Sequence, residues 1–169
     1  MTLETLLAGP ILRRTDLGRV IVWVATAEPA SVTADVFAID AGGPGKYELQ
    51  KVGTGEAETA RLGPRLFIHL IGAIPEGDSF PVDRLLAYDI VVRPEDGAPK
   101  NLRDLGLVSG PNSVTYGDLP LPTFFIRKET PTLHVLHGSC RLLHGKGEDS
   151  LIAADEIIER YALNARACR

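Results

Sequence analysis

The residues best suited to chemistry lie close together near the carboxyl-terminal end of the sequence. Residues 134–151 read His-Val-Leu-His-Gly-Ser-Cys-Arg-Leu-Leu-His-Gly-Lys-Gly-Glu-Asp-Ser-Leu. A short apolar run at 132–136 leads into this segment, and a helical pattern follows it. Open α/β sheets bind their ligands at polar turns of this kind, at the carboxyl end of a buried strand. The pattern therefore predicts a β-loop-α unit with a ligand-binding turn around Cys140.

Three interpretations of Cys140 are compatible with its spacing. Its thiolate could ligate a transition metal together with His137 and His144. It could also be the nucleophile of a phosphate-binding loop, because Lys146 lies six residues after it and before a predicted helix. Cysteine phosphatases have an arginine at that position, and lysine lacks the bidentate fork of arginine. The third interpretation is a small buried apolar residue at the end of a sheet. A nucleotide-binding P-loop is disfavoured, because the glycine spacing differs and no Ser or Thr follows Lys146.

The composition and charge of the chain limit the classes of partner that it can bind. The 169 residues carry 18 Lys and Arg against 22 Asp and Glu, a formal net charge of -4, and no segment concentrates the basic residues. Nucleic acids and anionic membranes are bound through dense positive patches, so neither is expected as a partner. No apolar run approaches the roughly 20 residues of a membrane-spanning helix.

Cysteine usage and the amino terminus indicate a reducing compartment. Cys140 and Cys168 flank a predicted helix of roughly 12 residues, which is about 18 Å long at 1.5 Å per residue. A disulfide requires Cα atoms within about 7 Å of each other, so this pair is not expected to form one. The start of the chain lacks the basic residues and the long apolar run of a signal peptide, and Arg13-Arg14 follows the apolar run. We therefore expect the chain to be cytoplasmic.

Residues 5–127 have the pattern of a domain built from short antiparallel strands. β-Branched and aromatic residues are frequent in runs separated by Gly and Pro turns, namely 19–25, 31–39, 47–52, 65–73 and 80–92. Regularly spaced strands of this kind are typical of an immunoglobulin-like or fibronectin type III-like antiparallel sandwich. We therefore predict a mainly β fold, with this sandwich over 5–127 and a short β-α unit over 128–169.

Two aromatic residues favour the same class of sandwich. Trp23 lies on an early predicted strand, where such sandwiches place a core tryptophan. Tyr88 begins a Tyr-x-apolar-x-apolar run, which is similar to a tyrosine corner. Both residues are equally compatible with ordinary core positions, and either interpretation predicts that they are buried.

The segment after the predicted strands is irregular. Frequent Gly and Pro residues from 93 to 122 predict a long connection. Within it we expect a short helical turn near 102–105 and one extra strand near 113–116. Residues 124–127 are predicted to form a last strand or an apolar segment against the sandwich.

A final helix is predicted from about Asp149 or Ser150 to Tyr161 or Leu163. Asp149 and Ser150 can cap its amino terminus. Helical spacing brings four side chains into one apolar stripe: Leu151, Ala154, Ile158 and Tyr161. Such a stripe must pack against something, either the sandwich or another molecule. A homo-oligomer formed through this helix is one expected arrangement.

Two segments of the chain resemble the PhoD-like (alkaline phosphatase D) metallophosphatase family. Residues 136–155, Leu-His-Gly-Ser-Cys-Arg-x-x-His-Gly-x-Gly-x-Asp-Ser-Leu-x-Ala-x-Asp, resemble the start of its catalytic domain. The front of the chain, with Leu7-Ala-Gly-Pro-Ile-Leu-Arg-Arg and Val20-Ile-Val-Trp-Val, resembles the β-sandwich that precedes that domain. The resemblance implies a parent enzyme that hydrolyses phosphate mono- or diesters with iron and calcium. It also implies that Cys140 is a ligand of iron and that Arg141 faces the substrate phosphate.

The chain departs from the family in one respect that bears on activity. The other metal ligands of the family, including a Gly-Asp-x-x-Tyr turn and later Asn and His motifs, lie beyond the point reached by residue 169. Gly117-Asp118 precedes the predicted strand at 132–136 and cannot replace that turn. Because metal-assisted hydrolysis needs a closed ligand set, we expect no activity from this chain alone and assign it no catalytic residue. The alternative is a stand-alone immunoglobulin-like interaction or scaffold module.

Overall fold

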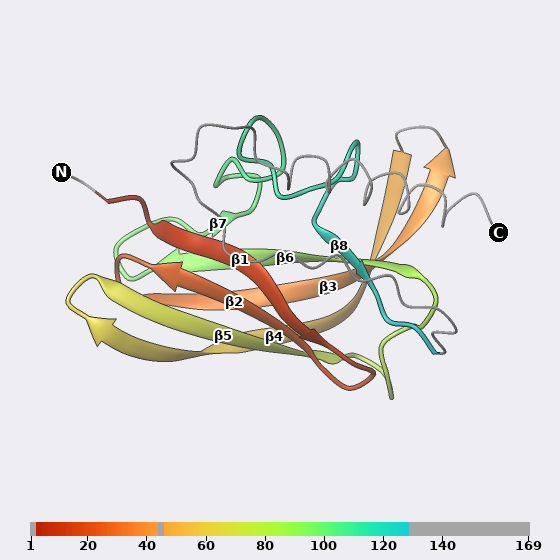
Figure 1. Cartoon of the computed structure of the whole chain (residues 1–169), viewed down its shortest axis with the longest axis horizontal. Helices are drawn as coiled ribbons and strands as arrows, with labels where there is room; N and C mark the ends of the chain where they lie inside the picture. Colours follow the sequence, from red (N-terminus) through yellow and green to blue (C-terminus); the bar gives the residue numbers. More distant parts are fainter. Residues whose placement is uncertain (1–2, 44–45, 129–169) are drawn as a thin grey trace, which may run out of the picture. The chain divides into compact units, whose positions relative to one another are not determined.

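Eight β-strands form the regular structure of residues 3–43 and 46–128, which are the residues described by this computed structural model (Figure 1). In chain order they are β1 Leu6–Thr15, β2 Val20–Thr26, β3 Ala30–Gly43, β4 Lys46–Gly63, β5 Leu66–Pro75, β6 Leu85–Pro94, β7 Lys100–Asn101 and β8 Thr123–Phe125. These two ranges contain no helix, so the prediction of a mainly β protein is confirmed for them. The predicted strand, loop and helix of the β-α unit lie outside the described residues.

The strands pair into one antiparallel sheet that curls into a half-barrel (Figure 1). Their order across the sheet is β1-β2-β5-β4-β3-β6-β7, and β8 also pairs with β6. Every pair in the sheet is antiparallel. β1 and β2, β3 and β4, and β4 and β5 are neighbours both in sequence and in the sheet. The connections from β2 to β3 and from β5 to β6 instead cross to a strand that is not a neighbour in the sheet.

The strand β4 connects the two halves of the sheet. Its first part pairs with β3 and its second part pairs with β5. The overlap lies at Gly53 and Gly55, where the backbone comes very close to its neighbours. A Cβ atom at Gly53 would overlap the Phe80 ring, and one at Gly55 would overlap the carbonyl oxygen of Gly72. Glycine is therefore required at both positions, and the continuity of the sheet depends on it.

The sequence predicted an immunoglobulin-like or fibronectin type III-like sandwich, which has two separate sheets. Hydrogen bonds between β4 and β5 instead make one continuous sheet. The reason is that β4 runs to Gly63, well beyond the predicted 47–52, and thereby reaches β5. The architecture that the strand pairing establishes is an antiparallel curled sheet.

Alternate residues of the strands fill the core. On β2, Val20, Val22 and Val24 have no solvent exposure, whereas Ile21 and Trp23 are half-buried on the opposite face. The predicted alternation of this strand is therefore confirmed. The prediction that Trp23 is a core residue is wrong, because the two-residue period of the strand determines the face and the size of the side chain does not.

Tyr88 on β6 is a core residue, as predicted. Its side chain is 4% exposed, and its ring lies 6.4 Å from the ring of Phe124 on β8, measured between centroids. The backbone N–H of Tyr88 donates to the Pro122 carbonyl at 3.1 Å. The prediction of a last strand near 124–127 is thus confirmed, since β8 seals this part of the core.

The connection between β7 and β8 is held by local hydrogen bonds. Asn101 and Asp104 bind each other reciprocally, each side chain accepting from the backbone N–H of the other at 2.9 and 3.1 Å. Leu105 N–H also donates to the Asn101 carbonyl at 3.0 Å, so the helical turn expected near 102–105 is present as a single turn. The strand expected near 113–116 is absent from this described segment, where Val114 instead bonds to the Leu107 carbonyl within the loop.

Candidate functional site

The residues predicted to do chemistry lie outside the described part of the chain. This applies to Cys140 and Arg141, and equally to His137, His144 and Lys146. Their roles in binding a metal or a phosphate therefore stay predictions. Among residues 3–43 and 46–128, no group of three or more His, Cys, Asp or Glu side chains is arranged to hold a metal ion.

A buried histidine connects three strands of the described sheet. His69 on β5 has no solvent exposure, and a threonine hydroxyl lies at each of its ring nitrogens. Nε2 lies 2.8 Å from Thr26 Oγ1 on β2, and Nδ1 lies 2.8 Å from Thr59 Oγ1 on β4. Thr26 also donates its hydroxyl proton to the Glu28 carbonyl at 2.7 Å. His69 thus links β2, β5 and β4 through side chains as well as through the backbone.

These hydrogen bonds assign the tautomer of His69. Because Thr26 donates its one hydroxyl proton to Glu28, its oxygen must accept the proton on Nε2 of His69. In a neutral ring the Nδ1 lone pair then accepts the hydroxyl proton of Thr59. Burial lowers the pKa of His69, since a charged ring would lose its hydration. With both nitrogens occupied and no access from solvent, His69 stabilises the sheet and does not act on a substrate.

A polar cluster on β3 and β4 centres on Asp35. Its carboxylate accepts from Thr54 Oγ1 at 2.6 Å and pairs with Lys51 Nζ at 2.7 Å. Burial by itself raises the pKa of Asp35, but the hydrogen bonds from Lys51 and Thr54 outweigh burial and the net shift is downward. Asp35 is therefore an ionised carboxylate whose hydrogen bonds join two strands, which is a structural role.

Asp89 on β6 pairs in register with Asp35, and its pKa is shifted in the opposite direction. Burial raises the pKa of Asp89, the nearby Asp35 and Asp104 carboxylates add to that rise, and two backbone N–H donors partly offset it. Its Oδ1 accepts the backbone N–H of Leu102 at 3.0 Å, and the Leu102 side chain is fully buried. Asp89 therefore anchors the turn after β7 to the sheet.

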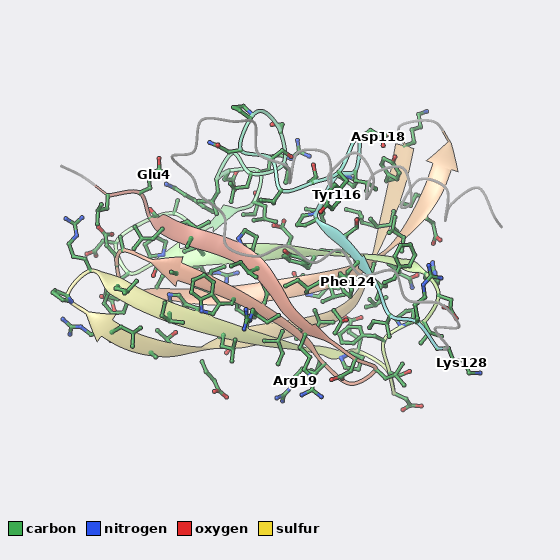
Figure 2. All side chains as sticks on the ribbon, viewed as in Figure 1. Glu4, Arg19, Tyr116, Asp118, Phe124 and Lys128 are labelled. Carbon is green, nitrogen blue, oxygen red and sulfur yellow. The ribbon has the colours of Figure 1, made fainter. Side chains whose placement is uncertain are left out.

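A groove of about 530 Å³ lies between the start of β1 and the turn after β7. One wall consists of residues 3–9, and Glu4 lies at this end of the chain (Figure 2). The other wall is formed by Lys100, Asp104, Leu105, Leu107 and Asn112. β1 is an edge strand, so this wall also offers backbone hydrogen-bonding groups. The groove mixes one lysine with two acids and apolar side chains, which suits binding more than metal or nucleophilic chemistry.

Apolar side chains are exposed on the outer surface of β1, β2 and β5. Ile11, Trp23 and Leu70 stand in direct register across the three strands, and Ile21 and Ile68 lie beside this row. Ile11 is 45% exposed and Leu70 is 42% exposed, and the other three are half-buried. We call these five residues the outer apolar face. Contiguous exposed apolar residues mark interaction sites more often than single ones do.

The sequence pattern predicted which strand face His69 and Leu70 occupy, but it did not predict the outer apolar face. The alternation in 65–73 separates His69 from Leu70, which the structure confirms. Ile11 was missed because no strand was predicted for residues 6–15, where Gly9-Pro10 and Arg13-Arg14 interrupt the apolar pattern. The pairing of Leu6 and Ile11 with β2 could have been suspected from the apolar pairs at 6–7 and 11–12.

A search for membrane-spanning helices and three comparisons with known proteins bear on what the chain can be. No helix within the described ranges is long and apolar enough to cross a membrane. The predicted likeness to PhoD-like phosphatases rests on residues 7–14, 20–24 and 136–155 of the sequence. A comparison of the chain with models of protein families, with curated proteins and with solved structures finds no match.

Proposed function

We propose that this chain is the amino-terminal portion of a PhoD-like, metal-dependent phosphatase. The parent enzyme would hydrolyse phosphate mono- or diesters, with Cys140 as a ligand of iron and Arg141 beside the phosphate. The observation that carries the proposal is the Gly-Ser-Cys-Arg sequence at 138–141, a predicted turn between an apolar strand pattern and a helix pattern. A thiolate at such a turn is a soft ligand that suits a transition metal.

The position of this turn in the chain supports the proposal. The residues up to Lys128, which we call the β unit, form a compact body of their own. The apolar run at 132–136 begins only a few residues later. A β domain followed directly by the first strand of a catalytic domain is the order that the resemblance implies. In this order the β unit would serve as a scaffold that flanks the substrate cleft.

We also infer that the β unit is a variant of the fibronectin type III-like sandwich. One layer would consist of β1, β2 and β5, and the other of β4, β3, β6 and β8, with the bonds between β4 and β5 joining them along one side. The strand order and the buried Tyr88 support this assignment. In this variant β4 would close one side of the sandwich, since it pairs with β3 along its first part and with β5 along its second.

Phosphatase assays of the full chain test the proposed role of Cys140. Because one thiolate does not close a metal site, the chain supplied with iron and calcium should not hydrolyse p-nitrophenyl phosphate. Hydrolysis that a chelator abolishes would contradict our inference that the metal site of this chain is incomplete. Hydrolysis that ignores chelators but is lost in Cys140→Ser, and retained in the Cys168→Ser control, would instead identify Cys140 as a nucleophile.

The downstream reading frame provides a second, independent test. The proposal predicts that it continues into a Gly-Asp-x-x-Tyr segment with the remaining metal ligands, and a frame without them would contradict it. A stand-alone interaction module is the second candidate, and the outer apolar face favours it, because that face offers contact area without any catalytic group.

A further inference from the structure

The start of β1 is a sheet edge that lines the groove between β1 and the turn after β7. Leu6 pairs in register with Thr26, and the bond beside this pair runs from the Ala27 N–H to the Thr5 carbonyl at 3.0 Å. In an antiparallel ladder, such a bond belongs beside a pair whose own N–H and C=O groups point away from each other. Leu6 therefore directs its N–H and C=O to the outer edge of β1, where no other described strand pairs with it (Figure 1).

The part of β1 that lines the groove lacks the features that protect most exposed edges. Proline and charged side chains on an edge strand oppose the pairing of a further strand. β1 has both beyond the groove, since Pro10 has no N–H to donate and Arg13 and Arg14 are exposed. Residues 6–8 are Leu-Leu-Ala and carry neither feature. Along β1, the edge is thus open to a further strand where it lines the groove.

The facing wall of the groove is fixed by backbone hydrogen bonds of its own. The N–H of Leu107 donates to the Leu102 carbonyl at 2.8 Å, and the Leu107 carbonyl accepts the N–H of Val114 at 2.9 Å. Leu105 and Leu107 line the groove from this side, and Leu7, which is 38% exposed, lines it from β1. A segment between the two walls would form ladder bonds with β1 and apolar contacts with the leucines.

We propose that the groove binds an extended, basic peptide segment of a partner protein, which adds a strand to β1. The groove volume of about 530 Å³ is within the range of about 300–1,000 Å³ that is typical of ligand pockets. In this mode of recognition, main-chain hydrogen bonds provide affinity and contacts to alternate side chains provide specificity. The outward N–H and C=O of Leu6 bond to the peptide backbone, and the leucines contact its apolar side chains.

The charges that line the groove select this occupant. Glu4 lies on the β1 side and Asp104 on the other side, against the ammonium group of Lys100, and all three residues are exposed (Figure 2). The excess of one carboxylate favours a segment that carries lysine or arginine. A second copy of this chain that paired its own β1 with this edge would add another Glu4 to these carboxylates. The same charges therefore disfavour a second copy.

Binding of a short capped peptide in which valine alternates with lysine tests the proposal on the full chain. Titration calorimetry should show saturable binding, and a peptide with glutamate in place of lysine should bind at least about tenfold more weakly. A peptide with the same side chains but methylated backbone nitrogens should not bind, because it cannot donate to the Leu6 carbonyl. No binding of the lysine peptide at up to about 1 mM, or equal binding of either control peptide, would overturn the proposal.

Two substitutions near the start of β1 locate the site. Leu6→Pro removes an N–H that does not bond to β2, so it should weaken peptide binding by about tenfold or more while circular dichroism shows a retained fold. Glu4→Lys leaves the backbone unchanged and should reverse the preference toward the glutamate peptide. Glu48→Lys makes the same change in charge at an exposed position of β4 outside the groove, and it should leave both affinities unchanged. Equal effects of Glu4→Lys and Glu48→Lys would contradict this site.

Sedimentation of the full chain distinguishes a partner peptide from a second copy. The proposal predicts that Leu6→Pro leaves the oligomeric state of the chain unchanged, because the edge of β1 is reserved for the peptide. A dimer that Leu6→Pro dissociates would place a second copy in the groove and would overturn the proposal.

Discussion

At the scale of single residues, His69 links stability to pH. Its neutral ring donates to Thr26 and accepts from Thr59, and burial keeps its pKa below the ordinary value of 6.5. Protonation in the folded state would place a charge in the core and turn Nδ1 into a donor, so Thr59 would have to give up its own donation. The unfolded chain has neither constraint and therefore takes up the proton at higher pH.

This difference predicts the direction of the pH dependence. Below pH 6.5 and above the folded pKa, the unfolded chain binds more protons, so the free energy of unfolding falls as the pH is lowered. One proton accounts for a slope of at most about 1.4 kcal/mol per pH unit. Urea unfolding of the full chain at about pH 7.5 and about pH 5.5 measures it.

The control for this prediction is His69→Gln, which retains a donor and an acceptor but does not titrate. Its free energy of unfolding should fall less over the same pH interval than that of the unsubstituted chain. The other histidines of the sequence are the same in both proteins, so their contribution cancels in the comparison. An equal fall in both proteins would show that His69 is not responsible.

Trp23 shows where sequence-based prediction fails at the residue scale. A large aromatic residue on an early strand suggested the core, but its neighbours Val22 and Val24 occupy the buried positions of β2. The alternation in the sequence already placed Trp23 on the face opposite Val22 and Val24. The two-residue period of a strand determines which residues share a face, and here it outweighs the apolar character of one side chain.

At the scale of elements, strands with strong alternation were predictable and those with polar or glycine-rich sequences were not. The runs 19–25 and 65–73 are β2 and β5 within two residues at each end. Half of β4 was missed, since residues 53–63 contain Gly53, Gly55 and many polar side chains, which have low strand propensity. That half forms a strand because of its pairing with β5, which is a tertiary effect.

The close approach at Gly55 predicts how sensitive this pairing is. Gly55→Ala places a methyl group against the backbone of Gly72 and Ala73, which cannot move aside as a flexible side chain would. We expect a loss of about 1–3 kcal/mol in the free energy of unfolding, as for an overpacked core. Gly77→Ala is the matched control, because no atom lies within 4 Å of its Cβ position, and its effect should stay within about 0.5 kcal/mol. Equal effects of the two substitutions in urea unfolding would contradict the role of Gly55.

At the scale of the whole molecule, the β unit and the predicted chemistry occupy different stretches of the chain. The described residues supply a core, a groove and an apolar face, and among them no cluster suited to a metal ion. The predicted metal ligand Cys140 follows the β unit in sequence. The class of the fold could thus be predicted from alternating patterns, whereas the candidate site rests on one short motif and on a family resemblance.

The most direct measurement is a spectroscopic titration of the full chain with Co²⁺ under anaerobic conditions, with Co²⁺ standing in for iron. A thiolate ligand produces a sulfur-to-metal charge-transfer band, which hydroxyl and carboxylate ligands do not. The account predicts this band in the unsubstituted chain and in Cys168→Ser, and its loss in Cys140→Ser. A band that persists in Cys140→Ser, or no band in any of the three proteins, would contradict the assignment of Cys140 as a metal ligand.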